Sequence, residues 1–306
     1  MVRCDEVSIV VCTADRAGVL GRCLHSLEPF RAAGVEVVVV DNGRPSTAVE
    51  IVAARCGARW VWEPRRGLGA ARNCGIRAAR GSLLVFIDDD ARAEPDWLSR
   101  LLAPFDDPEV SCVAGGVRAE NLPTAVSQVF DRWVRGAVPP VRLTLDAQAQ
   151  GCRFPLRLAM HGLGGNIAFR RSAFERFGCF DERFGRGTRI GSGEDTERLF
   201  ALLLGGAKIV CEPSAVVVHD FPTEKKALSA CVFRSAAAHM ALLVKYFVGA
   251  PHLRKDILGY LAARGLAFLH RPATGASPSL PRIPLLLGSC YGPVAYWLSS
   301  PVRSER

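Results

Sequence analysis

Short aliphatic runs alternate with stretches of helical periodicity through the first hundred residues. The aliphatic runs predict buried strands, at 7–12, 35–40, 60–62 and 83–87. The periodic stretches between them predict helices, at 19–27, 46–56 with Ser46 as the cap, and 69–79. This alternation is typical of βαβ units, so we predict an α/β fold in which helices flank a mostly parallel sheet.

The pattern is less regular further along the chain. We predict strands at 110–117, 163–170, 208–211 and 215–218, and helices at 124–135 and 194–204. Paired glycines, Gly164 and Gly165, precede the polar Asn166 in the second of these strands. A glycine-dense segment, 184–193, is expected to be mobile and leads into the helix that opens with Glu194 and Asp195, where the helix dipole favours acidic groups.

Polar side chains follow three of the predicted strands directly. In parallel sheets, ligands bind beyond the carboxyl ends of the strands. The residues at these ends are Thr13 and Asp15, Asp41 and Asn42, and the run Asp88, Asp89 and Asp90. The three groups should therefore meet at one edge, which is the arrangement that a nucleotide pocket requires.

The run LLVFIDDD, residues 83–90, ends a hydrophobic strand in three consecutive carboxylates. Two carboxylates about 4 Å apart repel by about 4 kcal/mol at an effective dielectric of about 20, so a cation is expected between them. Oxygen ligands of this kind suit Mg²⁺ or Mn²⁺. The alternative is a solvated acidic turn that caps the next helix.

The net positive charge of the chain lies at its C-terminal end. Residues from 225 onward carry eleven basic and two acidic side chains, so the whole formal net charge of +9 resides there and residues 1–224 are neutral. We therefore predict one domain over 1–224 and a basic, helical extension over 225–306. The extension should meet an anionic membrane surface, or else pack on the body through an apolar face. It lacks the stacking aromatics of a nucleic-acid binder.

Nothing in the sequence predicts a membrane span or an export signal. The uncharged stretch 283–300 is interrupted by Pro284 and Pro293, and the first apolar run is too short for a signal peptide. The 11 cysteines form no CxxC pair, as expected of reduced thiols. We expect a cytoplasmic protein, peripheral on the inner face of the membrane.

An ordered series of segments resembles the inverting family 2 glycosyltransferases of the GT-A fold over about residues 7–220. The segments are VSIVVCTADR, EVVVVDNGRPS, RRGLGAARNCGIRAARG, LLVFIDDD, GGNIAFRR and GEDTERL. The resemblance implies that Asp41 contacts the nucleotide base, that the triple aspartate binds ribose and metal, and that Asp195 is the catalytic base.

The same resemblance implies roles for the remaining polar residues. Asp90 and His219 would hold Mn²⁺ or Mg²⁺, and Asp88 or Asp89 would contact the ribose. Thr13, Asp15 and Asn42 would line the nucleotide pocket, Arg72 would approach phosphate or base, and Glu194 would orient the acceptor. The alternatives are structural: a hydrogen-bonded His219, a solvated Arg72, and first-turn helix acids at Glu194 and Asp195.

The implied reaction moves a hexosyl group from a nucleoside-diphosphate sugar to an acceptor hydroxyl on a glycan, a lipid-linked glycan or a natural product. The expected nucleotide is UDP first, then GDP or dTDP. Cys12 and the segment DNGRPS depart from the family pattern, so the sequence leaves the choice of base open. No glutamine-arginine-tryptophan signature follows Asp195, so one sugar is added per encounter.

Three other functions compete with this interpretation. A pyrophosphorylase would need its glycine loop after the first strand, and a dinucleotide oxidoreductase would need a third glycine at Arg72. The remaining alternative is a non-catalytic module that binds a nucleotide sugar or a membrane partner.

Overall fold

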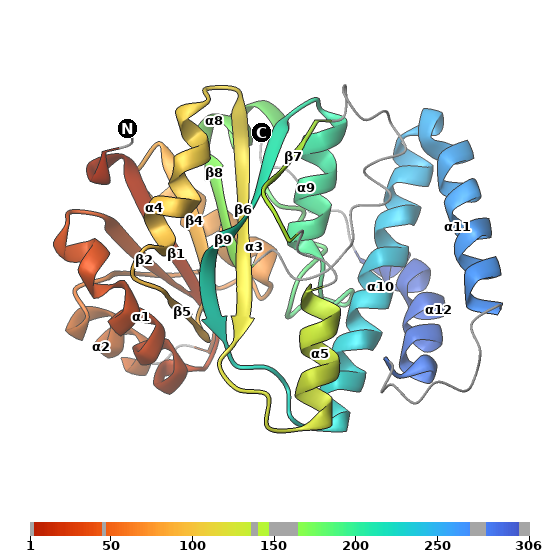
Figure 1. The fold of residues 1–306 in the computed structure, drawn as a ribbon, viewed down its shortest axis with the longest axis horizontal. Coiled ribbons are helices and arrows are strands. Elements are labelled where there is room, and N and C mark those ends of the chain that lie inside the picture. The colour runs from red at the N-terminus through yellow and green to blue at the C-terminus, as the bar shows by residue number, and fades with distance from the viewer. Residues whose placement is uncertain (1–2, 45–46, 136–139, 147–164, 270–279, 300–306) are drawn as a thin grey trace.

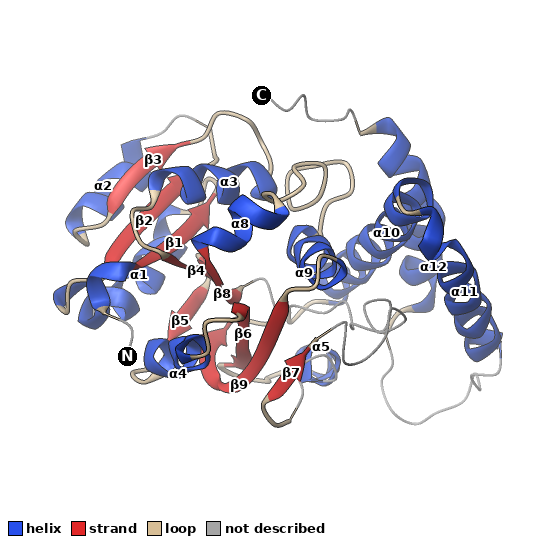
Figure 2. Cartoon of the chain, turned by 90° about the horizontal axis from the view of Figure 1, so that it is seen from above, coloured by secondary structure: helices blue, strands red, loops and turns tan. Residues whose placement is uncertain are grey.

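The computed structural model describes residues 3–44, 47–135, 140–146, 165–269 and 280–299. The described strands form one nine-stranded sheet with helices on both faces (Figures 1 and 2). The strands are β1 (Val7–Thr13), β2 (Glu36–Asp41), β3 (Arg59–Trp62), β4 (Leu83–Asp88), β5 (Ala91–Ala93), β6 (Val110–Ala119), β7 (Leu143–Leu145), β8 (Asn166–Arg170) and β9 (Lys208–His219). Their order is β3-β2-β1-β4-β8-β6-β9-β5, with β7 on the side of β9.

The helices alternate with these strands through the body and then follow one another to the C-terminus. They are α1 (Ala17–Ala32), α2 (Thr47–Arg55), α3 (Leu68–Ala78), α4 (Trp97–Leu102), α5 (Ala125–Arg135), α8 (Arg171–Phe177), α9 (Glu194–Leu204), α10 (Lys225–Gly249), α11 (Arg254–Leu269) and α12 (Arg282–Leu298). The first four strands pair in parallel. The predicted α/β fold, with a mostly parallel sheet flanked by helices, is confirmed.

Several local predictions differ from the structure. The segments 208–211 and 215–218 belong to one long strand, β9, because a register shift opposite Gly115 and Gly116 lets the pairing with β6 continue. The short elements β5, β7, α4 and α8 were not predicted, since three to seven residues give no clear period. Ser46, Leu163 and Gly164 lie outside the described residues.

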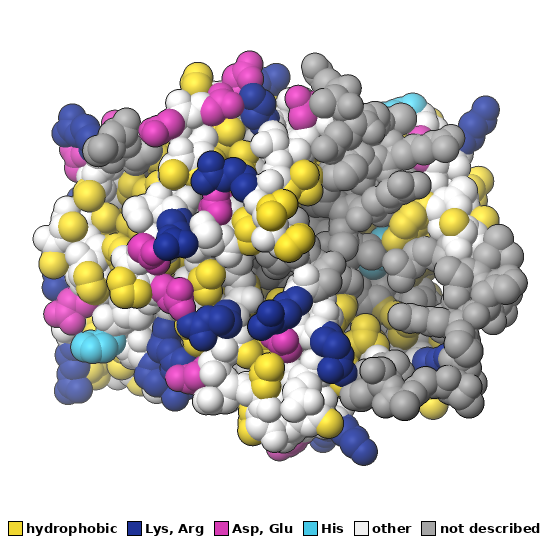
Figure 3. Space-filling view, in the orientation of Figure 1, with side chains coloured by type: hydrophobic (Ala, Val, Ile, Leu, Met, Phe, Trp, Pro, Cys, Tyr) yellow, Lys and Arg dark blue, Asp and Glu magenta, His cyan; other side chains and the backbone are white. Residues whose placement is uncertain are grey.

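Two apolar layers cover the two faces of the sheet. Buried side chains of α1, α2 and α4 form one layer, and those of α3, α8 and α9 form the other. Burial of β1 and β4 on both sides explains their uninterrupted aliphatic sequences. On the face in Figure 3, basic and acidic side chains are interspersed over the body, in keeping with its neutral net charge.

The C-terminal helices lie together against one end of the body (Figure 1). Residues of α10 share a buried cluster with Phe184, Ile190 and Phe200, and a second cluster with α5. Among the described helices, α10 alone is long and apolar enough to cross a membrane by composition, but 44% of its most apolar stretch is buried inside the protein. A domain boundary at residue 224 stays a prediction.

Candidate functional site

Strand register brings the predicted polar groups to one edge of the sheet. Thr13 at the end of β1 is paired with Asp41 at the end of β2. On its other side, Cys12 of β1 is paired with Asp88 of β4. Because these strands run in parallel, their carboxyl ends coincide and the acidic groups are held on a rigid base.

Asp90 and His219 meet across the pairing of β5 with β9. The Oδ1 atom of Asp90 lies 2.8 Å from Nε2 of His219, and Nδ1 of His219 lies 2.9 Å from the carbonyl oxygen of Asp220. Burial opposes the charged imidazolium, but the hydrogen bond and charge of Asp90 raise the pKa of His219 to about 9. Burial likewise opposes ionisation of Asp90, yet His219 and Arg16 hold its pKa well below the usual value.

Asp88 completes a group of possible metal ligands. One ligand atom each from Asp88, Asp90 and His219 lie within 4.8 Å of one another. Two carboxylates and one imidazole form a hard oxygen and nitrogen donor set that Mn²⁺ and Mg²⁺ accept. A side chain at Gly165 would approach Oδ2 of Asp88 to 2.5 Å, so glycine at this position keeps the space beside the carboxylate open.

Asp89 points into the protein instead of toward this group. Its Oδ2 atom accepts a hydrogen bond of 2.6 Å from Thr13, and its Oδ1 atom lies 2.7 Å from Arg16. Burial raises its pKa to about 6, although Thr13 and Arg16 oppose that shift. Arg16 also contacts Asp90 at 2.7 Å. Thr13 and Asp89 therefore fix the position of the turn that carries Asp90.

Arg72 is a buried cation beneath the acidic groups. Its side chain is 3% exposed and lies 3.0 Å from Glu194 and 3.6 Å from Asp88. Its guanidinium also lies over the rings of Phe86 and Phe180, at 5.9 and 5.4 Å. Burial raises the pKa of Glu194 to about 7, with Arg72 opposing the shift. The predicted contact of Arg72 with phosphate or base stays a prediction; the structure shows it bridging two acids.

Asp195 follows Glu194 in the first turn of α9, and its Oδ1 atom accepts a hydrogen bond of 2.7 Å from the Thr196 amide. Two hydrogen bonds to its backbone hold the preceding loop. The Leu68 amide donates to the carbonyl oxygen of Arg186 at 2.8 Å, and the Tyr291 hydroxyl donates to the carbonyl oxygen of Arg189 at 3.3 Å. The loop ends at a glycine in the left-handed region, immediately before α9. The loop that leads to Asp195 therefore contacts both α3 and α12.

The pocket predicted to bind the nucleotide contains Asp15, Asp41 and Asn42. Asp15 has a φ of 59° and accepts a hydrogen bond of 2.8 Å from the Arg44 amide. Asp41 accepts one from the Gly43 amide at 3.0 Å, while its buried Oδ2 atom has no hydrogen-bond partner among the described residues. Buried polar atoms usually have a hydrogen-bond partner, so an N–H group of a ligand would satisfy the Oδ2 atom of Asp41.

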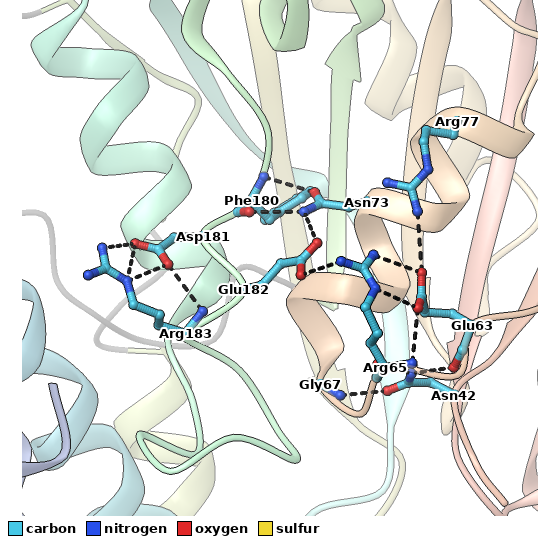
Figure 4. A network of polar contacts seen from close by, with 10 residues as sticks. All are labelled: Asn42, Glu63, Arg65, Gly67, Asn73, Arg77, Phe180, Asp181, Glu182 and Arg183. Atoms are coloured by element: carbon cyan, nitrogen blue, oxygen red, sulfur yellow. Dashed lines mark hydrogen bonds and ion pairs between the residues drawn. The ribbon is translucent and has the colours of Figure 1, made fainter. Parts of the chain in front are cut away.

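The side chain of Asn42 makes three hydrogen bonds within the protein (Figure 4). Its amide donates to the carbonyls of Glu63 and Arg65 at 2.8 and 2.7 Å and accepts from Gly67 at 2.8 Å. Figure 4 also shows that α3 is joined to the segment before the glycine-rich loop. Asn73 of α3 donates to the carbonyl oxygen of Phe180 and accepts from the Phe180 amide, each at 3.0 Å. The two ends of the site are thus mechanically linked.

A cavity of about 230 Å³ joins the acidic groups. Five predicted site residues line it, namely Arg72, Asp88, Glu194, Asp195 and His219. Further lining side chains come from α5 and α10, including Phe130, Trp133, Arg234 and His239. These residues and Arg16 were not predicted from the sequence, because only the packing of distant helices shows which of their faces reaches the site.

The chain matches known sequences over most of its length. The model of "Glycosyl transferase family 2" matches residues 8–178. A pre-mycofactocin glycosyltransferase of Mycobacterium tuberculosis is 30% identical over 72% of this chain and 43% of its own length. The succinoglycan biosynthesis protein ExoM of Rhizobium meliloti is 30% identical over 78% of this chain and 76% of its own length. The chain thus spans less than half of the first relative.

Solved structures show the same fold. The mannosyltransferase PcManGT from Pyrobaculum calidifontis, in complex with GDP-Man and Mn²⁺, superposes with a TM-score of 0.57 at 22% identity and covers 96% of this chain and 76% of its own. Glucosyl-3-phosphoglycerate synthase from Mycobacterium tuberculosis gives 0.54 at 20% identity, over 78% and 79% of the two chains. From the sequence match and the shared fold together, this chain belongs to glycosyltransferase family 2.

Proposed function

We propose that the protein is a metal-dependent inverting glycosyltransferase that moves one hexosyl group from a nucleoside-diphosphate sugar to an acceptor hydroxyl. The observation that carries the proposal is one cavity in which Asp88 and His219, two of three clustered metal ligands, face the acidic pair Glu194 and Asp195. A binding module would need the first group, but it would not need a carboxylate beside the acceptor.

The donor would lie along the sheet edge. Asp41, with its unpaired buried oxygen, would accept a hydrogen bond from the base, and Asp15 lies next to it. UDP is the first candidate nucleotide, followed by GDP and dTDP. Asp88, Asp90 and His219 would hold Mn²⁺ or Mg²⁺, which when bound neutralises the negative charge on the leaving diphosphate.

Proton transfer belongs to Asp195. In a single displacement the acceptor oxygen forms a bond to the anomeric carbon while the bond to the diphosphate breaks, and the hydroxyl proton passes to the carboxylate of Asp195. Attack opposite the leaving group inverts the anomeric centre. Arg72 acts as a positioning residue, because it holds Glu194 on α9 and Asp88 on β4 at fixed places.

The C-terminal helices offer a surface for the inner face of an anionic membrane. Large apolar side chains lie exposed along one side of α12: Ile283, Leu286, Leu287, Tyr291, Val294, Trp297 and Leu298. The opposite side packs tightly on α10, since a Cβ at Gly292 would lie 2.2 Å from the Ala237 carbonyl oxygen. Arg282 is the one charged residue in α12, and the extension carries the net charge of the whole chain.

Vesicles of phosphatidylglycerol test this surface. At low salt they should bind the protein, and Leu287→Glu should weaken binding at least tenfold, whereas Ile51→Glu, at an exposed position on α2, should not. Lack of binding, or a stable dimer that buries α12 in solution, would contradict the membrane proposal.

Two measurements test the catalytic proposal. Thermal unfolding with UDP, GDP or dTDP should show stabilisation that depends on Mn²⁺ and is lost in Asp90→Ala, with about 2.7 kcal/mol gained at about 100 times the dissociation constant. Asp195→Asn should keep this stabilisation while transfer falls about 10²- to 10⁴-fold. Unchanged transfer in Asp195→Asn would remove it from the mechanism, and no transfer by the unaltered protein would favour the binding module.

A further inference from the structure

The cavity beside the acidic groups has two chemically different ends. At one end are the carboxylates of Asp88, Glu194 and Asp195. The other end is apolar, and its lining side chains come from β6, α5 and the segment after β9: Val117, Phe130, Trp133, Val134 and Phe221. Two unlike ends in one cavity fit a ligand that is polar where it reacts and apolar elsewhere.

Aromatic rings connect the two ends. Phe221 follows His219 by two residues, and their ring centroids are 6.0 Å apart. Phe130 lies 5.0 Å from Phe221 and 5.4 Å from Trp133, each pair packed edge to face. Phe221 is buried, while Phe130 and Trp133 are half-buried. The wall formed by these three rings therefore leads from the metal ligands outward.

The remaining part of the cavity lining comes largely from α10, which packs beside α5. Cys231, Ser235, Ala238 and Leu242, all of them small or apolar, line the cavity from this helix together with Arg234 and His239. The charged side chain here, Arg234, lies against the glycine-rich loop, where a Cβ at Gly191 would be 3.2 Å from its Cδ atom. The described residues around the apolar end thus offer a ligand mainly hydrocarbon contacts.

The nucleotide does not need this space. Thr13, Asp15, Asp41 and Asn42, which mark the nucleotide end, are not among the described residues that line the cavity. The base would therefore lie along the sheet edge, away from Phe130 and Trp133. Of the two substrates in the proposed transfer, the acceptor remains to fill the apolar end.

We propose that the acceptor carries its reactive hydroxyl on an apolar ring, which lies against Phe130 and Trp133 while the hydroxyl reaches Asp195. This inference rests on the proposed function, since it assigns the second substrate of that reaction. A buried sugar acceptor would leave hydroxyls without partners here, at about 1–3 kcal/mol each. An apolar ring gains about 25 cal/mol for each Å² removed from water.

Calorimetry on the full chain, with and without UDP and Mn²⁺, tests the inference. The probes are 4-methylumbelliferone, a ring-bearing hydroxyl compound; methyl β-D-glucopyranoside, a sugar; and geraniol, an open-chain alcohol. 4-Methylumbelliferone should bind at least tenfold more tightly than either of the others. Trp133→Ala should weaken its binding at least tenfold, whereas Trp297→Ala, on the exposed side of α12, should leave it unchanged.

Ser235→Phe provides a second variant that fills the cavity from α10 and should also weaken binding at least tenfold if Trp133→Ala does not fold. Equal or tighter binding of the glucoside or geraniol, no effect of either cavity variant, or no binding of any probe would overturn the inference. Stabilisation by UDP and Mn²⁺ is measured on the same samples. If UDP and Mn²⁺ do not stabilise the protein, the proposed transferase function is contradicted. Binding of the ring compound is measured separately, so it can fail while stabilisation by UDP and Mn²⁺ is still observed.

Discussion

Lys245 joins the C-terminal helices to the body of the protein, so its removal should destabilise the whole protein. Its Nζ atom lies 2.7 Å from Asp181 and 2.6 Å from Glu197, whose side chains are 12% and 3% exposed. Tyr246 also donates to Glu197 at 2.9 Å. In Lys245→Met the aliphatic stem is kept, while the buried carboxylate of Glu197 and the partly buried carboxylate of Asp181 lose their shared cation.

The magnitude follows from burial and from the pKa of Asp181. Breaking a fully buried ion pair from one side costs about 3–5 kcal/mol. Lys245 is 23% exposed and Asp181 keeps Arg183, so the expected loss is about 2–3 kcal/mol. Burial opposes ionisation of Asp181, but Arg183 and Lys245 lower its pKa from 3.8 to about 2. That shift corresponds to about 2 kcal/mol shared by the two cations.

The pH dependence has a definite sign. Because the pKa of Asp181 is lower in the folded protein, its stabilisation is present above pH 3.8 and is lost as the pH falls toward 2. The difference in unfolding free energy between the unaltered protein and Lys245→Met should therefore be largest near neutral pH. It should shrink as Asp181 becomes protonated.

The assay is thermal and urea unfolding followed by circular dichroism, with Lys226→Met as control because Lys226 is an exposed lysine of the same helix. We expect one transition, lowered by about 4–6 °C in Lys245→Met and by less than about 1 °C in the control. Equal shifts in both variants would refute the assigned ion pair. A separate early transition would show that residues 225–306 unfold independently of the body.

Three further substitutions test other parts of the site. Asn42→Ala should lower the unfolding free energy by about 2–3 kcal/mol, because three hydrogen bonds that hold the loop at 63–67 are lost; an effect no larger than that of the exposed Asn121→Ala would contradict this. Gly193→Ala should lower the unfolding free energy by about 1–3 kcal/mol, because the φ of Gly193 is 86° and the new methyl group would lie 2.7 Å from Cβ of Ala238. An unchanged urea midpoint would rule out this contact. Arg72→Met should lower the unfolding free energy by about 3–5 kcal/mol, because it leaves buried acids without their cation. In the folded variant the pKa of Glu194 should rise further, which NMR titration can measure. An unchanged pKa of Glu194 would exclude the ion pair with Arg72.

Much of the site was accessible from sequence because it follows the ends of buried strands. The aliphatic runs before Thr13, Asp41 and Asp88 predict parallel strands, and parallel strands end at the same edge. The acids after them therefore had to converge. The basic excess after residue 224 was also evident, but the sequence left open whether those helices pack on the body or face a membrane.

The individual partners within the site depended on tertiary structure. Asp89 belongs to the same acidic run as Asp90, yet one is turned inward to Thr13 and the other faces His219, because the chain reverses between β4 and β5. Arg72 resembles any helix-face arginine in the sequence. Its burial follows from the packing of α3 on β1 and β2, which places Arg72 between Asp88 of β4 and Glu194 of α9.

The sequence by itself determined the order of strands and helices in the first half, the acidic strand ends and the uneven distribution of charge. Tertiary structure decided which side chains share a cavity, and above all that α5 and α10 close it with Trp133 and Ser235. The physical reason is the distance along the chain over which the interactions act. Strand and helix periods arise between neighbours in the chain, whereas a cavity wall depends on packing between segments a hundred residues apart, and that packing is not encoded in any local pattern.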